Sequence, residues 1–254
     1  MPTSATWAWG SDSELSFPFT DVTSAPLTMS IWFRITTNIT SSGSHNLMFL
    51  GDTATEDNYW KMEIDDAGVG NTHRANVTAT TGRTITGSGG LNLNQWYLST
   101  FVIRSPTDYE LYLDGVSEGA DTLSRAPTSV DAIALGREID STDDDSFLGQ
   151  LDFGCVWDTD LDDAEIAALA KGVYPTLIRP ASLKSCVRVL SETLAMDLVS
   201  QRTFTRVALT AYTGEPAPVN IYPSSQILQF PPAAAAAGVF DIFSPGIITG
   251  APAL

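Results

Sequence analysis

The chain has 254 residues, 43% of them hydrophobic, and its 13 basic and 30 acidic residues give a formal net charge of -17. The hydrophobic fraction is sufficient for a buried core, which excludes a wholly disordered chain. The negative charge repels phosphates, so we expect no nucleic-acid binding by the main body, and no apolar run approaches the ~20 residues that would insert into a membrane.

The beginning of the chain, MPTSATWAWG, lacks the basic and apolar regions of a secretory signal peptide. We therefore do not expect this protein to be exported by the ordinary secretory route. The two cysteines, Cys155 and Cys186, are too few for a disulfide framework and do not have the spacing of a metal site.

Apolar and polar residues alternate with a period of two along the first 157 residues, which predicts an all-β fold. The strands are expected at residues 27–35, 46–50, 59–64, 74–80, 96–103, 109–113, 132–135 and 147–157. Polar breakers separate them, for example residues 81–90 (TGRTITGSGG). Asp114-Gly115 predicts a tight hairpin turn. Short strands without interleaved helices favour two antiparallel sheets packed as a sandwich.

One short helix is predicted near residues 162–171 (DDAEIAALAK). Asp162 and Glu165 match a capping box, and Leu161 and Ile166 match a hydrophobic staple. Gly172 supplies the expected helix stop. The acidic residues that precede the helix are favoured there by its dipole, and they lack the glycine and the last glutamate of a calcium-binding EF-hand loop.

A change of composition follows the helix. Residues 1–170 have a net charge of -19, whereas residues 171–254 have a net charge of +2 and hold 9 of the 14 prolines. We therefore divide the chain into a sandwich domain, 1–172, and an extended Pro-rich C-terminal arm, 173–254. The apolar end of the arm, residues 231–254, is expected to be buried, either on its own sandwich or on a neighbouring subunit.

Several segments of residues 11–172 together resemble the laminin-G-like, concanavalin A-like jelly-roll superfamily. They are MSIWFRI, QWYLSTFVI, YELYLDGV, IALGRE and, most specific, FLGQLDFGCVWDTDLDDAEIAAL. The resemblance implies a jelly-roll sandwich. Members of this superfamily include sugar-binding modules, calcium-containing modules and glucanases. Versions that are followed by a Pro-rich tail resemble structural proteins of tailed-phage virions.

Two groups of residues are candidates for ligand binding. Tyr59 and Trp60 follow a polar run and offer aromatic rings on which a sugar could stack, although burial of Trp60 is the alternative. Asp143, Asp144 and Asp145 form an oxygen-rich loop that could hold calcium. No other cofactor is expected.

The sequence patterns that would indicate catalysis are weaker than those that indicate ligand binding. Glu63 and Asp65 resemble the start of the glucanase motif Glu-x-Asp-x-x-Glu, but Gly68 stands where the last carboxylate is needed. His45 and His73 have no neighbouring metal or triad partner in the sequence, and we expect both at the surface. The chain is therefore predicted not to be an enzyme.

These features lead to three hypotheses. The first is a structural protein of a tailed-phage virion, either a capsid decoration or a tail-associated protein, assembled in the host cytoplasm. Its jelly-roll head would be exposed and capable of weak glycan binding, and its arm would anchor it to copies of itself and to other virion proteins. The second is a carbohydrate-binding, lectin-like module, and the third is a glycoside hydrolase.

Overall fold

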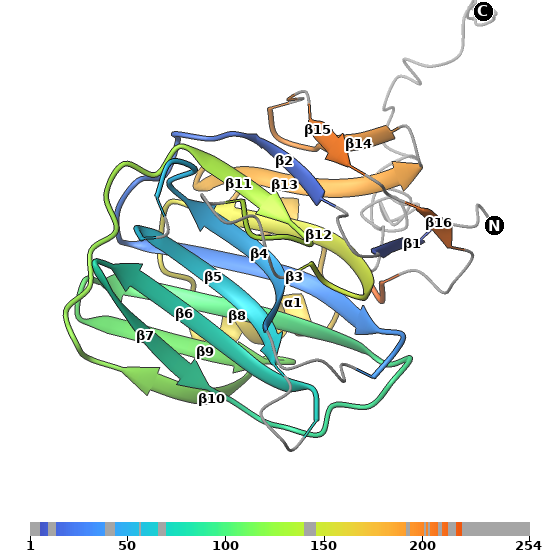
Figure 1. Ribbon diagram of the computed structural model, residues 1–254, viewed down its shortest axis with the longest axis horizontal. Coiled ribbons are helices and arrows are strands. Elements are labelled where there is room, and N and C mark those ends of the chain that lie inside the picture. The colour runs from blue at the N-terminus through green and yellow to red at the C-terminus, as the bar shows by residue number, and fades with distance from the viewer. Residues whose placement is uncertain are drawn as a thin grey trace, which may run out of the picture. The chain divides into compact units, whose positions relative to one another are not determined.

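The computed structural model describes residues 6–9, 14–38, 44–55, 57–65, 70–139, 146–191, 194–200, 202, 204–207, 210–212 and 217–219. These residues belong to one compact unit, Met1–Asn220. They form two antiparallel sheets packed as a sandwich, with α1 (Asp163–Ala170) on the side away from the smaller sheet (Figure 1). Among the described residues, no helix is both long and apolar enough to cross a membrane.

The larger sheet, sheet A, has the strand order β10-β9-β8-β3-β12-β1-β16, and β13 and β14 extend it from β12. Its strands are β1 (Thr6–Trp9), β3 (Leu27–Ile35), β8 (Trp96–Ser105), β9 (Asp108–Leu113), β10 (Val116–Asp121), β12 (Gly149–Trp157), β13 (Leu183–Ser191), β14 (Leu194–Asp197) and β16 (Thr210–Tyr212). Asp114 and Gly115 join β9 to β10 with φ angles of 50° and 81°, which confirms the predicted tight turn.

The smaller sheet, sheet B, has the order β15-β2-β11-β4-β5-β6-β7. Its strands are β2 (Glu14–Pro18), β4 (Ser44–Gly51), β5 (Tyr59–Asp65), β6 (Thr72–Ala79), β7 (Thr81–Thr86), β11 (Ala132–Leu135) and β15 (Thr205–Val207). The all-β sandwich predicted from the alternation is therefore confirmed. Residues 81–86 were predicted to be a breaker, which is wrong. They form an edge strand on β6 although only Ile85 is buried, so period-two alternation gave no signal.

The main core lies between the sheets. The central strands contribute alternate side chains to it, among them Phe33 of β3, Met62 of β5 and Phe101 of β8. A second apolar cluster lies on the other face of sheet A, where Ile166 and Leu169 of α1 are buried. Burial of these aliphatic and aromatic side chains is the main driving force for folding, and each Å² of buried apolar surface contributes about 25 cal/mol.

The predicted capping of α1 is confirmed. The Asp162 carboxylate accepts a 2.9 Å hydrogen bond from the backbone N–H of Glu165, and the Glu165 carboxylate accepts one of 2.9 Å from the N–H of Asp162. Leu161 and Ile166 are both buried in the second cluster. Gly172 follows the helix with a φ of 84°, a conformation that glycine adopts without strain.

The segment after Gly172 first forms the short 3-10 helix η1 (Pro175–Leu177) and then adds β13 to β12. Further along, β15 pairs with β2 and β16 pairs with β1. Part of the predicted arm thus completes the sandwich. Residues 220–254 lie outside the described residues, so an assembly role for the arm stays a prediction.

A disulfide bond joins Cys155 of β12 to Cys186 of β13. The two cysteines are directly opposed in the sheet, both side chains are fully buried, and 31 residues separate them in the chain. Closing a loop of that length reduces the conformational entropy of the unfolded chain. The bond therefore ties the β13–β14 hairpin to the sheet.

Replacing both cysteines by alanine should lower the free energy of unfolding by about 3–4 kcal/mol, mostly through the added freedom of the unfolded chain. Urea unfolding with and without a reductant measures the effect. The double variant should be insensitive to the reductant, whereas the unfolding midpoint of the wild type should fall. Equal midpoints for the oxidised wild type and the variant would contradict this expectation.

Candidate functional site

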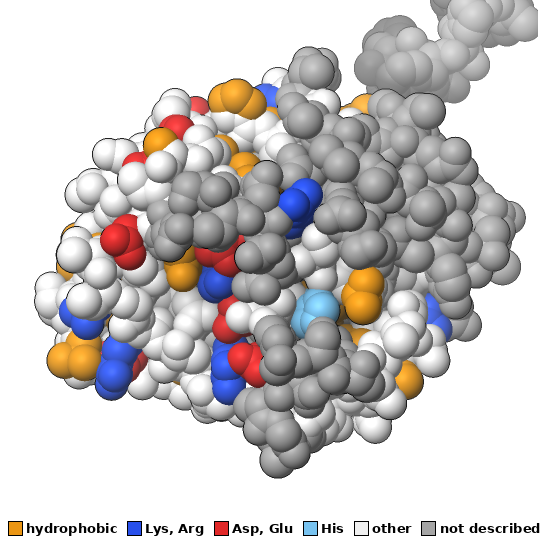
Figure 2. All heavy atoms as spheres, in the orientation of Figure 1, with side chains coloured by type: hydrophobic (Ala, Val, Ile, Leu, Met, Phe, Trp, Pro, Cys, Tyr) orange, Lys and Arg blue, Asp and Glu red, His pale blue; other side chains and the backbone are white. Residues whose placement is uncertain are grey.

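The strands of sheet B present a polar outer face, away from the core. Alternation along β5 directs Trp60, Met62 and Ile64 inward and the residues between them outward. The register with β6 places polar residues beside the outward ones. The resulting outer face of sheet B on β5 and β6 consists of Tyr59, Lys61, Glu63, Asp65, Arg74, Asn76 and Thr78. Figure 2 shows acidic and basic side chains intermixed over the middle of this sheet.

The two predicted aromatic residues lie on opposite faces of β5. The Trp60 indole is 1% exposed and belongs to the core, so it presents no ring to a sugar in this structure. Tyr59 is partly exposed on the outer face, where Lys61 Nζ lies 5.2 Å from its ring centroid. Burial raises the pKa of the Tyr59 phenol, which keeps it neutral. Of the pair, only Tyr59 is placed to touch a ligand.

A buried ion-pair network lies beside Tyr59. Lys61 Nζ is 3.2 Å from Glu63 Oε2 and 2.5 Å from Glu138 Oε2, and all three side chains are nearly inaccessible. Burial alone would lower the pKa of the Lys61 ammonium, but attraction to Glu63 and Glu138 outweighs it and raises that pKa. The two carboxylates therefore neutralise a cation. They do not face an open cleft in which a glycosidic bond could be placed.

Both histidines are buried, so the prediction of surface positions is wrong. His73 is 0% exposed; its ring stacks on Phe33 with a centroid distance of 6.0 Å, and Nε2 lies 2.7 Å from Ser99 Oγ. Its Nδ1 lies 3.6 Å from Glu118 Oε2. His45 contacts the backbone oxygen of Ser146 at 2.5 Å. These partners come from distant strands and loops, which the local sequence could not reveal.

A hollow of about 400 Å³ lies on the outer side of β2 and β11, and we call it the Ala132 hollow. Pro18, Ala132 and Ile139 give it apolar walls, while Ser16, Thr20 and Thr53 give it hydroxyl groups. Asp131 stands at its rim, where its carboxylate accepts hydrogen bonds from the Thr53 N–H at 3.0 Å and the Thr53 hydroxyl at 3.1 Å. Apolar walls with a few placed polar groups are typical of a small-molecule site.

The small residues that line this part of the sheet continue toward Tyr59. Ala132 pairs with Gly51, and Gly51 pairs with Tyr59. A Cβ atom on Gly51 would lie 2.5 Å from Phe49 Cζ and 2.6 Å from Tyr59 Cβ, so this position requires glycine. Sequence reasoning missed the hollow. The available signal was a strand, AIAL, whose outward positions are the alanines Ala132 and Ala134, whereas β5 carries larger polar residues at its outward positions.

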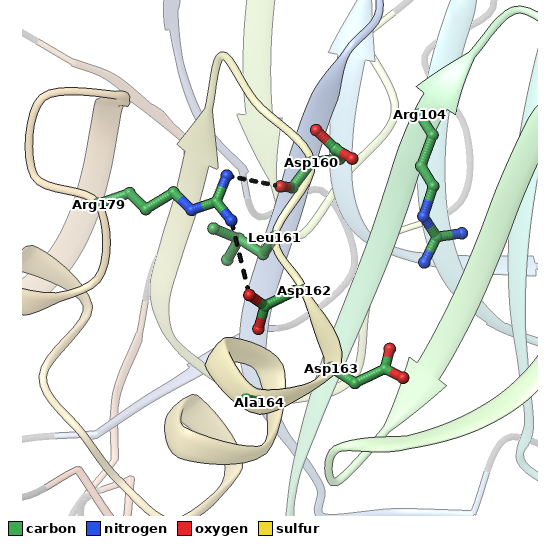
Figure 3. Close-up of a pocket in the computed structure, with 7 residues that line it drawn as sticks. All are labelled: Arg104, Asp160, Leu161, Asp162, Asp163, Ala164 and Arg179. Carbon is green, nitrogen blue, oxygen red and sulfur yellow. Dashed lines mark hydrogen bonds and ion pairs between the residues drawn. The ribbon is translucent and has the colours of Figure 1, made fainter.

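A second hollow, of about 430 Å³, lies beside the start of α1 (Figure 3). Arg179 Nη1 donates to the Asp160 backbone oxygen at 3.0 Å, and its Nε donates to Glu165 at 2.6 Å. Across the hollow, Arg104 Nη2 lies 2.8 Å from Glu110 Oε2. Each arginine is thus engaged by a carboxylate. Arg104 also donates to the Tyr112 hydroxyl at 3.1 Å, and this hydroxyl donates to Asp163 at 2.8 Å, which links α1 to sheet A.

The predicted calcium ligands Asp143, Asp144 and Asp145 lie outside the described residues. Within the described ranges, no group of three or more His, Cys, Asp or Glu side chains is arranged to hold a metal ion.

A buried carboxylate lies on β12, away from both hollows. Burial raises the pKa of Asp152 to about 7, although Arg188 Nε, 3.8 Å away, attracts the ionised form and opposes the shift. Burial outweighs this attraction, because 3.8 Å is long for an ion pair and the carboxylate is almost fully removed from water.

Asp152→Asn should gain stability over the wild type as the pH rises. The raised pKa means that the folded protein keeps a proton that the unfolded chain releases, so the destabilisation of the wild type by this group grows between pH of about 4 and 7 and persists above pH 7. The gain should approach roughly 4 kcal/mol at pH 8 and become small near pH 4. Urea unfolding at several pH values checks it. The half-exposed control Asp108→Asn should show no such trend, and a flat difference for Asp152→Asn would contradict the expectation.

The architecture and the paired sheets define a jelly-roll sandwich with a polar outer sheet face. A profile of the concanavalin A-like lectin/glucanase superfamily, the Laminin_G_3 family, matches residues 9–167, well over half of the chain. The chain therefore belongs to this superfamily, as its sequence resemblance predicted. No functionally curated protein sequence matches it.

Solved structures show the same fold at low sequence identity. A protein of Bacteroides ovatus ATCC 8483, provisionally assigned to carbohydrate binding, aligns with a TM-score of 0.63, 15% identity and coverage of 87% of this chain and 63% of its own. A heptameric SAP-like pentraxin from Limulus polyphemus aligns with a TM-score of 0.58 and 13% identity, covering 86% and 98%. NanB sialidase of Streptococcus pneumoniae aligns with a TM-score of 0.51 and 13% identity, covering 64% and 27%.

Proposed function

We propose that this protein is a non-catalytic carbohydrate-binding module that holds a glycan in the Ala132 hollow. The observation that carries the proposal is the chemistry of this hollow. Pro18, Ala132 and Ile139 offer apolar surface to the CH face of a sugar ring, while Asp131 and the neighbouring hydroxyls offer hydrogen-bond partners to its OH groups. Membership of a lectin superfamily and the structural likeness to a protein assigned to carbohydrate binding support it.

The network around Lys61 argues against glycoside hydrolysis as the function. A retaining glycosidase needs one carboxylic acid to donate a proton and one free carboxylate as nucleophile, about 5 Å apart. Glu63 and Glu138 both contact the same buried ammonium group, at 3.2 Å and 2.5 Å, so both carboxylates are already engaged by Lys61. Asp65, the next outward carboxylate of β5, is paired with Arg74.

Ala132→Phe should weaken glycan binding at least tenfold, because the added ring points away from the core and occupies the hollow. A glycan array followed by calorimetry on the strongest neutral ligand measures the loss. The matched control is Ala164→Phe, which adds the same ring at the second hollow, beside α1. Unchanged affinity in a folded Ala132→Phe protein, or an equal loss in the control, would contradict the proposed site.

A structural role in a tailed-phage virion is a separate proposal, supported by the resemblance to virion proteins and the apolar end of the chain. The buried disulfide is compatible with it, since such bonds persist on virion surfaces and are rare in reducing cytosol. In this proposal, residues after 220 bind neighbouring subunits.

The mass measured by light scattering should then be that of a defined oligomer for the full chain. For a folded 1–220 truncation it should be that of a monomer. A 1–172 truncation is unsuitable, because it removes strands that complete both sheets. Two monomers of the expected masses would contradict the assembly role while leaving glycan binding open.

A further inference from the structure

The charges around the Ala132 hollow restrict the kind of glycan that fits it. Among the residues that the structure describes, its lining includes the carboxylate of Asp131 and no lysine, arginine or histidine. An anionic sugar placed there would lie beside a like charge, without a cation to neutralise it. Juxtaposed like charges weaken binding strongly when water is partly excluded.

The cations elsewhere on the same sheet whose side chains the structure describes are already engaged: Lys61, Arg74 and Arg83. Lys61 lies between Glu63 and Glu138. Arg74 pairs with Asp65, and Arg83 at the edge strand pairs with Asp121 at 2.6 Å. A carboxylate on a ligand would have to displace a protein carboxylate from one of these pairs, and for Lys61 the pair is buried. The outer face therefore offers an anion little net attraction.

Arg202, a described cation near the β2 side of the hollow, is engaged as well. Arg202 pairs with Asp21, and its guanidinium lies 4.8 Å from the ring centroid of Phe19 and 5.6 Å from that of Phe17. Phe17 is one of the lining residues. The guanidinium is thus held between a carboxylate and two aromatic rings, which leaves it poorly placed to attract a ligand.

We infer that the Ala132 hollow selects an uncharged glycan and rejects sialylated, uronic and sulfated sugars. This inference rests on the proposed glycan-binding function and specifies its ligand class. Asp131 has two roles in it: it accepts hydrogen bonds from sugar hydroxyls, and it repels anionic substituents. The selectivity therefore depends on one carboxylate whose orientation is fixed by Thr53.

The test compares the binding of matched neutral and acidic oligosaccharides, such as lactose and 3′-sialyllactose, on an array. Calorimetry then measures the affinities of the best neutral binder and of its acidic derivative. At low salt the acidic member should bind at least tenfold more weakly. The difference should narrow as salt screens the repulsion, whereas the affinity of the neutral member should change little. An acidic member that binds as well as or better than the neutral one would overturn the inference and leave glycan binding intact.

Asp131→Asn keeps the shape of the side chain and removes its charge. The substitution should lower the affinity for the neutral ligand. It should also reduce the ratio of the affinities for neutral and acidic sugars at least threefold. Asp108→Asn is the matched control, since it changes the net charge equally at a half-exposed position outside the lining of the hollow. An unchanged preference in folded Asp131→Asn would overturn the role of this carboxylate. A complete absence of binding across the array would overturn both the proposed function and this inference.

Discussion

The register of β4, β5 and β6 determines both surfaces of sheet B at once. Because successive side chains of a strand point to opposite faces, the burial of Trp60, Met62 and Ile64 forces Tyr59, Lys61 and Glu63 to the outer face. A shift by one residue would expose three large apolar side chains and bury an unpaired lysine. The hydrophobic core therefore fixes the chemistry of the outer face, although none of the polar residues belongs to that core.

Lys61 also connects the sheet to the loop that follows β11. Its ammonium group contacts Glu138, and the next residue, Ile139, forms a wall of the Ala132 hollow. Burying charges is costly unless they are paired, so such a pair contributes more to a unique arrangement than to stability. Here the pair holds Glu138 at a defined position over β5. The shape of the hollow thus depends on an ion pair that need not touch the ligand.

Much of the fold could be predicted because its signals are local. Period-two alternation marked β3 and β11 at their observed bounds, and the capping box located the start of α1. The edge strands β7 and β10 escaped detection because most of their side chains are exposed, which removes the apolar half of the pattern. Trp60 shows the limit for sites. Its sequence context was compatible with either face, and only the register of the sheet placed it inside.

The hollow itself could not be predicted, because it joins three distant parts of the chain. Pro18, Thr53 and Asp131 meet only after β2 and β11 have paired and the turn after β4 has folded over them. One aspartate among many acidic residues carries no signal before that arrangement is known.

The pairing of the first strands with the last ones has a consequence for how the chain is made. Thr6 of β1 pairs with Tyr212 of β16, and Ser16 of β2 pairs with Thr205 of β15. A ribosome delivers the two ends of these pairs far apart in time, so β1 and β2 emerge long before their outer partners exist. Exposed strand edges of this kind promote association between nascent chains. These edges of β1 and β2 therefore gain their partners only when nearly the whole compact unit has been synthesised.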